Sequence, residues 1–154
     1  MRKFNSRHTV FGVAFLAGAM LAGSAVPAAA QVQSRMRVLV PDFVNAEGKS
    51  TKNGERLADK VRDQINEMPT HAPTEEKEWK DALKKYQLKE SDMDCVKWRQ
   101  LAAQANIAQL VLCGTLDEAT GAVTASFHPT AGGDAFEVPQ FAFQSPEQGA
   151  EQVV

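Results

Sequence analysis

The four consecutive apolar residues from Leu110 to Cys113 constrain the fold of this chain more than any other feature of its sequence. Successive side chains of a strand point to opposite faces of a sheet, so a strand with one solvated face alternates apolar and polar residues. An unbroken apolar run instead favours a central strand that is covered on both faces. We therefore predict that residues 109–116 form the central strand of an α/β fold.

The segments before this strand predict an earlier strand and a first helix. Residues 37–43 are a short apolar run interrupted by Pro41, which indicates a buried strand followed by a loop. Residues 54–68 carry apolar side chains at helical spacing, and Pro69 ends the pattern.

Two more helices are predicted between the first helix and the central strand. The second covers residues 74–86, with Thr74 as its N-cap and lysines in its last turn. The third covers residues 92–106 and follows a capping signal at Ser91 to Asp94.

The segments after the central strand predict two further strands. Residues 122–128 alternate, with Val123, Ala125 and Phe127 on one face. Residues 136–143 change parity around Pro139, which indicates an edge strand with a bulge. The apolar side chains of this strand are either core residues or a candidate partner-binding edge; they are Phe136, Val138, Phe141 and Phe143.

The order of these segments predicts an α/β (α+β sandwich) domain over residues 31–144, with a mixed four-stranded sheet and about three helices. The first and central strands should be parallel, and the last three strands should form a meander. Ser145 and Pro146 begin another helix with a good N-cap. Because this helix has no C-cap signal before Val154, we expect residues 145–154 to be the start of a truncated helix.

Residues 1–30 have the pattern of a cleavable signal peptide. A basic start precedes an apolar stretch from Val10 to about Val26, and small residues up to Ala30 supply the cleavage site. An uncleaved anchor is the alternative, although the stretch is short and rich in Ala and Gly. Ser24 stands where a bacterial lipobox has its lipid-bearing Cys, so we expect a periplasmic or secreted protein without a stable membrane anchor.

The charge of the mature chain argues against nucleic acid as a partner. The formal net charge of −2 includes three basic residues of the leader, and without them 14 basic residues face 19 acidic ones. No Lys or Arg follows Arg99. Binding to nucleic acid depends on cationic contacts to phosphate, which the last third of the chain does not offer.

Cys95 and Cys113 are the only cysteines of the chain. An even count in an exported domain favours one disulfide, which would be worth roughly 3 kcal/mol in the chain-entropy model. Two buried free thiols are the alternative, because the geometry of a cysteine pair cannot be inferred from sequence.

The sequence predicts no catalytic, cofactor or metal site. The mature chain has two histidines, His71 and His128, and neither forms a zinc-binding spacing with a cysteine. The loop 45–54 contains Gly48, Lys49 and Ser50 but lacks the spacing of a phosphate-binding loop, so we expect a solvated connection.

The segments 37–43 and 101–116, together with the helix ending near Met68, resemble a known family. It is the N-terminal α/β domain shared by the periplasmic translocation protein TolB and CsgG-like curli-secretion proteins. A closer likeness is to the opening domain of exported bacterial tetratricopeptide-repeat proteins. The resemblance covers most of residues 36–144 and implies a binding or scaffolding role. This chain contains no repeats, so repeat-mediated binding does not transfer to it.

These observations lead to three hypotheses about function. The first is a non-catalytic cell-envelope module that binds or positions a protein partner and belongs to a larger repeat-containing protein. The second is a periplasmic domain that binds a small ligand at the carboxyl ends of the strands within 38–40 and 110–113. The third is an envelope enzyme that uses Asp42 and an acidic residue from a loop.

Overall fold

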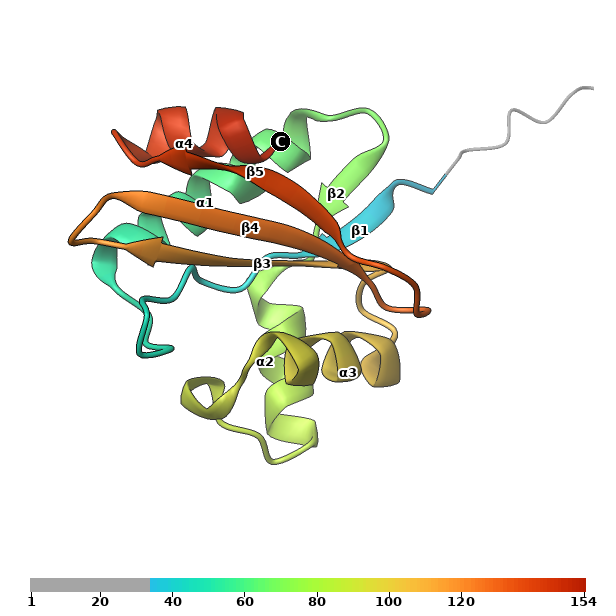
Figure 1. Ribbon diagram of the computed structural model, residues 1–154. Coiled ribbons are helices and arrows are strands. Elements are labelled where there is room, and N and C mark those ends of the chain that lie inside the picture. Colours follow the sequence, from blue (N-terminus) through green and yellow to red (C-terminus); the bar gives the residue numbers. More distant parts are fainter. Residues whose placement is uncertain (1–33) are drawn as a thin grey trace, which may run out of the picture. The chain divides into compact units, whose positions relative to one another are not determined.

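The computed structural model describes residues 34–154, so the predicted signal peptide at 1–30 lies outside the described residues. Figure 1 shows helices on both sides of a twisted sheet. The elements, in chain order, are β1 (Met36–Leu39), α1 (Lys52–Glu67), β2 (His71–Pro73), α2 (Glu76–Lys85), the 3₁₀ turn η1 (Glu90–Asp92), α3 (Cys95–Ala105), β3 (Leu110–Asp117), β4 (Ala122–Pro129), β5 (Phe136–Ala142) and α4 (Pro146–Val153). No helix among them is long and apolar enough to cross a membrane.

The sheet has the strand order β2-β1-β3-β4-β5. Strand β1 is parallel to both of its neighbours, and β3, β4 and β5 form an antiparallel meander. The parallel pairing of the first and central strands and the meander after them are as the sequence predicts. The chain leaves β1 toward one side through α1 and returns to its other side through α2 and α3, so a topological switch point lies between β1 and β3.

Each face of the sheet has its own hydrophobic core. On one face α1 and α4 pack on Val38, Leu112 and Val123, and on the other α2 and α3 pack on Leu39 and Val111. Neighbouring residues of β1 and β3 therefore enter different cores, which is why the apolar run of β3 has no polar interruption. The three-layer arrangement is visible in Figure 1.

The prediction of a four-stranded sheet is wrong by one strand, because His71–Pro73 forms β2 at the sheet edge. The backbone N–H of Met36 donates to Thr70, and that of Thr74 donates to Val38. A strand of three residues is too short to show any hydropathy period, and Pro73 within it and Pro69 before it indicate a loop. The helix at Ser145 is a fourth helix, with the Ser145 side chain accepting from the Gln148 N–H as its capping pattern predicts.

Two predicted helix starts also need correction. Thr74 is not an N-cap: its side chain is buried and its hydroxyl donates to the carbonyl of Ile107 at 3.0 Å, which ties the start of α2 to the loop before β3. Helix α3 begins at Cys95 rather than Asp92, because the Asp94 side chain accepts from the Lys97 N–H and caps it.

The bulge predicted in the last strand is present. Val123 pairs with Phe141 and Ala125 pairs with Val138, so two residues of β5 oppose one residue of β4. The extra residue restores the parity of β5, and side chains on both sides of Pro139 therefore face α1 and α4. As predicted, β5 is an edge strand.

Two glycines allow the segment after β1 to pass close to α1 and β3. A Cβ on Gly54 would lie 2.0 Å from the carbonyl oxygen of Phe43, and a Cβ on Gly114 would lie 2.1 Å from the Phe43 ring. The Phe43 side chain is completely buried. Glycine at both positions is therefore required by close packing.

We predict that Gly54→Ala lowers the free energy of unfolding by about 3 kcal/mol, because the new methyl group meets backbone that cannot rotate away. Gly149→Ala is the matched control in α4. There the nearest atom is the Leu57 Cδ1 at 2.8 Å, which can rotate away, and the gain in helix propensity offsets part of the cost. Urea denaturation of both variants measures the difference, and equal losses would contradict this account of Gly54.

Candidate functional site

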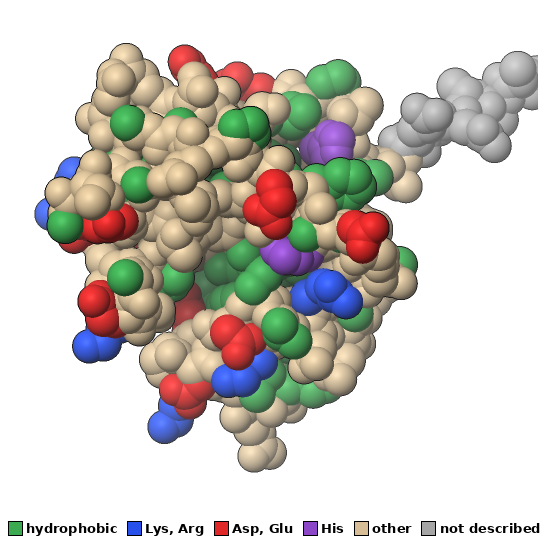
Figure 2. Space-filling model, viewed as in Figure 1, with side chains coloured by type: hydrophobic (Ala, Val, Ile, Leu, Met, Phe, Trp, Pro, Cys, Tyr) green, Lys and Arg blue, Asp and Glu red, His purple; other side chains and the backbone are tan. Residues whose placement is uncertain are grey.

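A cleft of about 490 Å³ opens where α2 and α3 stop covering the sheet. These two helices pack on β1 and β3, while the same face of β4 and β5 carries polar side chains, among them Thr124, Ser126 and Glu137. Figure 2 shows a hollow at this place with hydrophobic side chains inside it. The lining also includes the turn before α3 and the segment after β1, through Met93, Trp98, Pro41 and Asp42.

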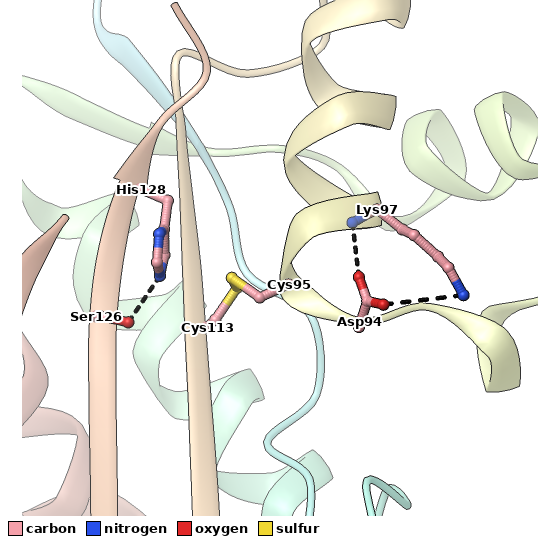
Figure 3. The surroundings of a disulfide bond; sticks show 6 residues. All are labelled: Asp94, Cys95, Lys97, Cys113, Ser126 and His128. Carbon is pink, nitrogen blue, oxygen red and sulfur yellow. Dashed lines mark hydrogen bonds and ion pairs between the residues drawn. A yellow bond between two sulfur atoms is a disulfide. The ribbon is translucent and has the colours of Figure 1, made fainter. Parts of the chain in front are cut away.

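A disulfide joins Cys95 to Cys113 in this cleft. Cys95 is the first residue of α3 and Cys113 lies in the middle of β3, with their Cα atoms 5.9 Å apart. Of the two states that the sequence left open, the structure has the disulfide (Figure 3). Both cysteines are half-buried, so the bond contacts solvent in the cleft.

His128 lies beside this disulfide. Strand pairing sets Ser126 opposite Cys113 and His128 opposite Val111, so all four side chains share one face of the sheet. The His128 Nε2 is 2.7 Å from the Ser126 hydroxyl (Figure 3). Ligand-type atoms of Cys95, Cys113 and His128 lie within 4.8 Å of one another.

The convergence of His128 on the cysteines is absent from any sequence motif, because 15 or more positions separate the residues in the chain. One signal was nevertheless present. The turn after Asp117 joins two predicted antiparallel strands, and counting back from it pairs Cys113 with Ser126, on the same face as His128. That step needs the strand register, which the alternation of β4 supports but does not define.

Asp42 lines the same cleft but is engaged in an ion pair. Its carboxylate accepts from Arg62 Nη2 and from the Ser50 hydroxyl, each at 3.2 Å, and Arg62 also donates to the Val40 carbonyl. Nearby, burial raises the pKa of the Glu90 carboxyl, and the negative charge of Asp42 raises it further. Asp42 and His128 thus face one cleft with separate hydrogen-bond partners.

The four apolar residues of the predicted edge do not form one exposed surface. Val138, Phe141 and Phe143 are partly buried and pack against the core under α1 and α4. Phe136 is the exception, with 64% of its surface exposed. Of the two interpretations of these residues, core packing applies to three, and Phe136 alone presents a large apolar side chain to solvent.

The loop 45–54 is held by its own hydrogen bonds. The Asn45 side chain accepts from the backbone N–H groups of Glu47 and Lys49, and Gly48 adopts a positive φ of 75°. Thr51 caps α1 by accepting from the Gly54 N–H. The loop is thus a turn with a helix cap.

Two solved structures resemble this chain along most of its length. The C-terminal domain of LpoB from Salmonella enterica superposes with a TM-score of 0.59 and 16% sequence identity, covering 75% of this chain and 87% of that one. The LpoB C-terminal domain from Escherichia coli gives a TM-score of 0.60 at 13% identity, with the same coverage. The chain shares the fold of these LpoB domains. Identities this low show a common fold and no more.

No protein-family model matches the sequence, and no curated protein matches it. The resemblance to TolB-like and CsgG-like domains therefore stays a prediction, as does the implied link to repeat proteins. The α/β fold expected from that resemblance agrees with the structure at the level of a mixed sheet with helices on both faces.

We predict that loss of the disulfide lowers the free energy of unfolding by about 3 kcal/mol. This is the free energy expected when a cross-link with a sequence separation of 18 no longer restricts the entropy of the unfolded chain. A Cys95→Ser, Cys113→Ser double variant, denatured in urea beside the oxidised protein, measures this. The double variant in the presence of reductant is the control, since reductant should then change nothing. Equal stability of the wild type and the double variant would contradict a structural role for the bond.

Proposed function

We propose that this protein is a non-catalytic, exported module of the cell envelope that binds a protein partner through the outer edge of β5. The observation that supports this most strongly is the unpaired edge of β5 with an exposed Phe136 at its start. An edge strand offers backbone N–H and C=O groups that an extended segment of another protein can pair with.

The bulge and Pro139 limit which part of the edge can be used. Proline offers no N–H, and a bulge twists the strand, so both features discourage pairing in the second half of β5. The first half, Phe136–Val138, keeps regular pairing with β4 on its inner side. A partner strand would therefore add at this half.

An apolar groove of about 230 Å³ lies beside Phe136. Its other walls come from the end of α1 and from β4, through Ile65, Met68 and Phe127. A strand added to β5 can place alternate side chains toward this groove, and buried aromatic and aliphatic anchors of this kind supply most of the energy in protein interfaces. The groove thus favours a partner with an extended, apolar segment.

The disulfide supports an oxidising compartment, because structural disulfides persist in exported proteins and are rare in the cytosol. The signal-peptide pattern of residues 1–30 supports the same location from a separate part of the chain. We therefore assign the partner to the periplasm or the cell surface. The resemblance to the opening domain of repeat proteins further supports a module that belongs to a larger envelope protein.

We predict that a photo-crosslinking phenylalanine analogue at position 136 forms an adduct with one envelope protein in intact cells. Val96 is a matched control position on α3, because its exposed fraction of 65% is almost equal to the 64% of Phe136. Mass spectrometry of the adduct identifies the partner. Adducts from position 96 but not from position 136 would contradict binding at β5.

Once the partner is identified, Phe136→Glu should raise its Kd about 30-fold, as expected when a central apolar anchor is lost. Val96→Glu, with the same change of charge at the same exposure, should leave the Kd unchanged. Circular dichroism of both variants checks that the fold is intact. Equal affinities of the two variants for the partner would show that Phe136 is not part of the interface.

The cleft supports a second candidate function, the binding of a small ligand. Its volume lies in the range of ligand pockets, and it opens near the switch point between β1 and β3, where open α/β sheets bind ligands. Its lining includes Asp92 and Glu137, which form no ion pair among the described residues, and their charges favour uncharged or cationic molecules such as sugars and amines.

A thermal-shift screen with sugars, amines and nucleotides tests this second candidate. A ligand present at about 100 times its Kd would stabilise the protein by about 2.7 kcal/mol and raise its melting temperature by several degrees. The Ser126→Trp variant, whose indole would fill the cleft, should lose that shift. If no compound raises the melting temperature of the wild type, this candidate function is excluded for these classes.

A further inference from the structure

The half-buried disulfide and His128 bring together three groups that bind metals when they are free. Cys95, Cys113 and His128 come from α3, β3 and β4, and their ligand-type atoms lie within 4.8 Å of one another. Figure 3 shows the His128 ring on β4 beside the disulfide, which spans from β3 to the start of α3. A tetrahedral zinc ion with its usual bond lengths needs ligand atoms about 3.5–3.8 Å apart, so small side-chain rotations suffice.

The charges around the disulfide favour a cation. Four acidic residues line the cleft, and its described lining contains no Lys or Arg. Asp42 and Asp94 are ion-paired with Arg62 and Lys97, so the charges of Asp92 and Glu137 remain to attract a cation. Cys95 is also the first residue of an 11-residue helix, whose positive end stabilises a thiolate. A metal site needs its thiols deprotonated, so this position favours binding.

The start of α3 can accommodate the change from a disulfide to two ligands. Breaking the bond lets the sulfur atoms separate to about 3.8 Å, the spacing at a zinc ion. Cys95 follows the turn η1 and the exposed residue Asp94, whereas Cys113 and His128 are held by strand pairing. The movement therefore falls mainly on the Cys95 side chain, and the other two ligands stay in place.

We propose that reduction of the disulfide creates a binding site for one zinc-class divalent cation, held by Cys95, Cys113 and His128. The fourth position faces the cleft and takes a water molecule. In the reduction, a dithiol gives two electrons and two protons to the disulfide and itself becomes a disulfide, leaving two cysteine thiols. Metal binding then releases both thiol protons, so disulfide and bound metal exclude each other.

Cobalt binding to the reduced protein tests the proposal. Under anaerobic conditions a trialkylphosphine reduces the disulfide, and water supplies the oxygen of the phosphine oxide and the protons of the two thiols. Titration with Co²⁺ should then give one equivalent bound, with a thiolate-to-cobalt charge-transfer band and the visible bands of a tetrahedral site, and Zn²⁺ should displace the cobalt. The oxidised protein should show none of these bands. A reduced, folded protein without the charge-transfer band would overturn the proposal.

Two histidine variants distinguish a metal site that includes His128 from metal binding by the two thiols alone. His128→Ala should weaken Zn²⁺ binding by more than about tenfold, since even the loss of an outer-shell partner costs that much. His71→Ala is the matched control, because His71 lies in β2 and is absent from the cleft lining. Equal affinities for the two variants would overturn the role of His128.

A folding measurement keeps the test decisive if reduction unfolds the protein. A metal that binds only the folded state stabilises it, so Zn²⁺ should restore the circular dichroism of the reduced wild type or raise its melting temperature. The same addition should stabilise His71→Ala as much as the wild type, and His128→Ala clearly less. Failure of Zn²⁺ to stabilise the reduced wild type would overturn the proposal, and this result is independent of any protein partner at β5.

Discussion

The burial of the parallel pair β1 and β3 on both faces is the constraint from which the rest of the structure follows. Val38 and Leu112 enter the core under α1 and α4, while Leu39 and Val111 enter the core under α2 and α3. Two helical layers are therefore required, and the chain supplies them on opposite faces of the sheet, with α1 and α4 on one face and α2 and α3 on the other. The fold is organised around these two strands, with β2 as a short addition and the meander extending the other side.

The helices on the two faces extend over different widths of the sheet. Helices α1 and α4 cover apolar side chains out to β5, whereas α2 and α3 cover only β1 and β3. The uncovered face of β4 and β5 is polar: Thr115 and Thr124 are hydrogen-bonded across it, and Ser126 bonds to His128. This difference creates the cleft, whereas β5 is an edge because it is the last strand in the order of the sheet. The cleft therefore lies on the face that α2 and α3 leave open, whereas the groove beside Phe136 lies on the face under α1 and α4.

Much of this architecture could be predicted from local patterns, and the failures have physical reasons. The unbroken apolar run of β3 predicted cover on both faces, and the parity change around Pro139 predicted the bulge of β5. Strand β2 was missed because three residues held by neighbouring backbone carry no period of their own. Thr74 has the chemistry of an N-cap, but a buried bond to Ile107 uses its hydroxyl instead.

The candidate sites depended still more on tertiary geometry. The even cysteine count pointed to a disulfide, yet the position of His128 beside it follows only from the register of β3 against β4. Likewise, sequence could not divide the four apolar residues of β5 between core and surface, because the bulge decides which of them face α1 and α4. Phe136, before the bulge and at the start of the strand, remained exposed.

Amide hydrogen exchange with and without the bound envelope partner tests the central claim most directly, namely that β5 is the binding edge. Backbone groups that gain a strand partner exchange more slowly, since they must open before exchange. We expect protection concentrated in the first half of β5, Phe136–Val138, with the exposed surfaces of α2 and α3 unchanged. Protection confined to α2 and α3, with β5 exchanging as fast as in the free protein, would contradict the account.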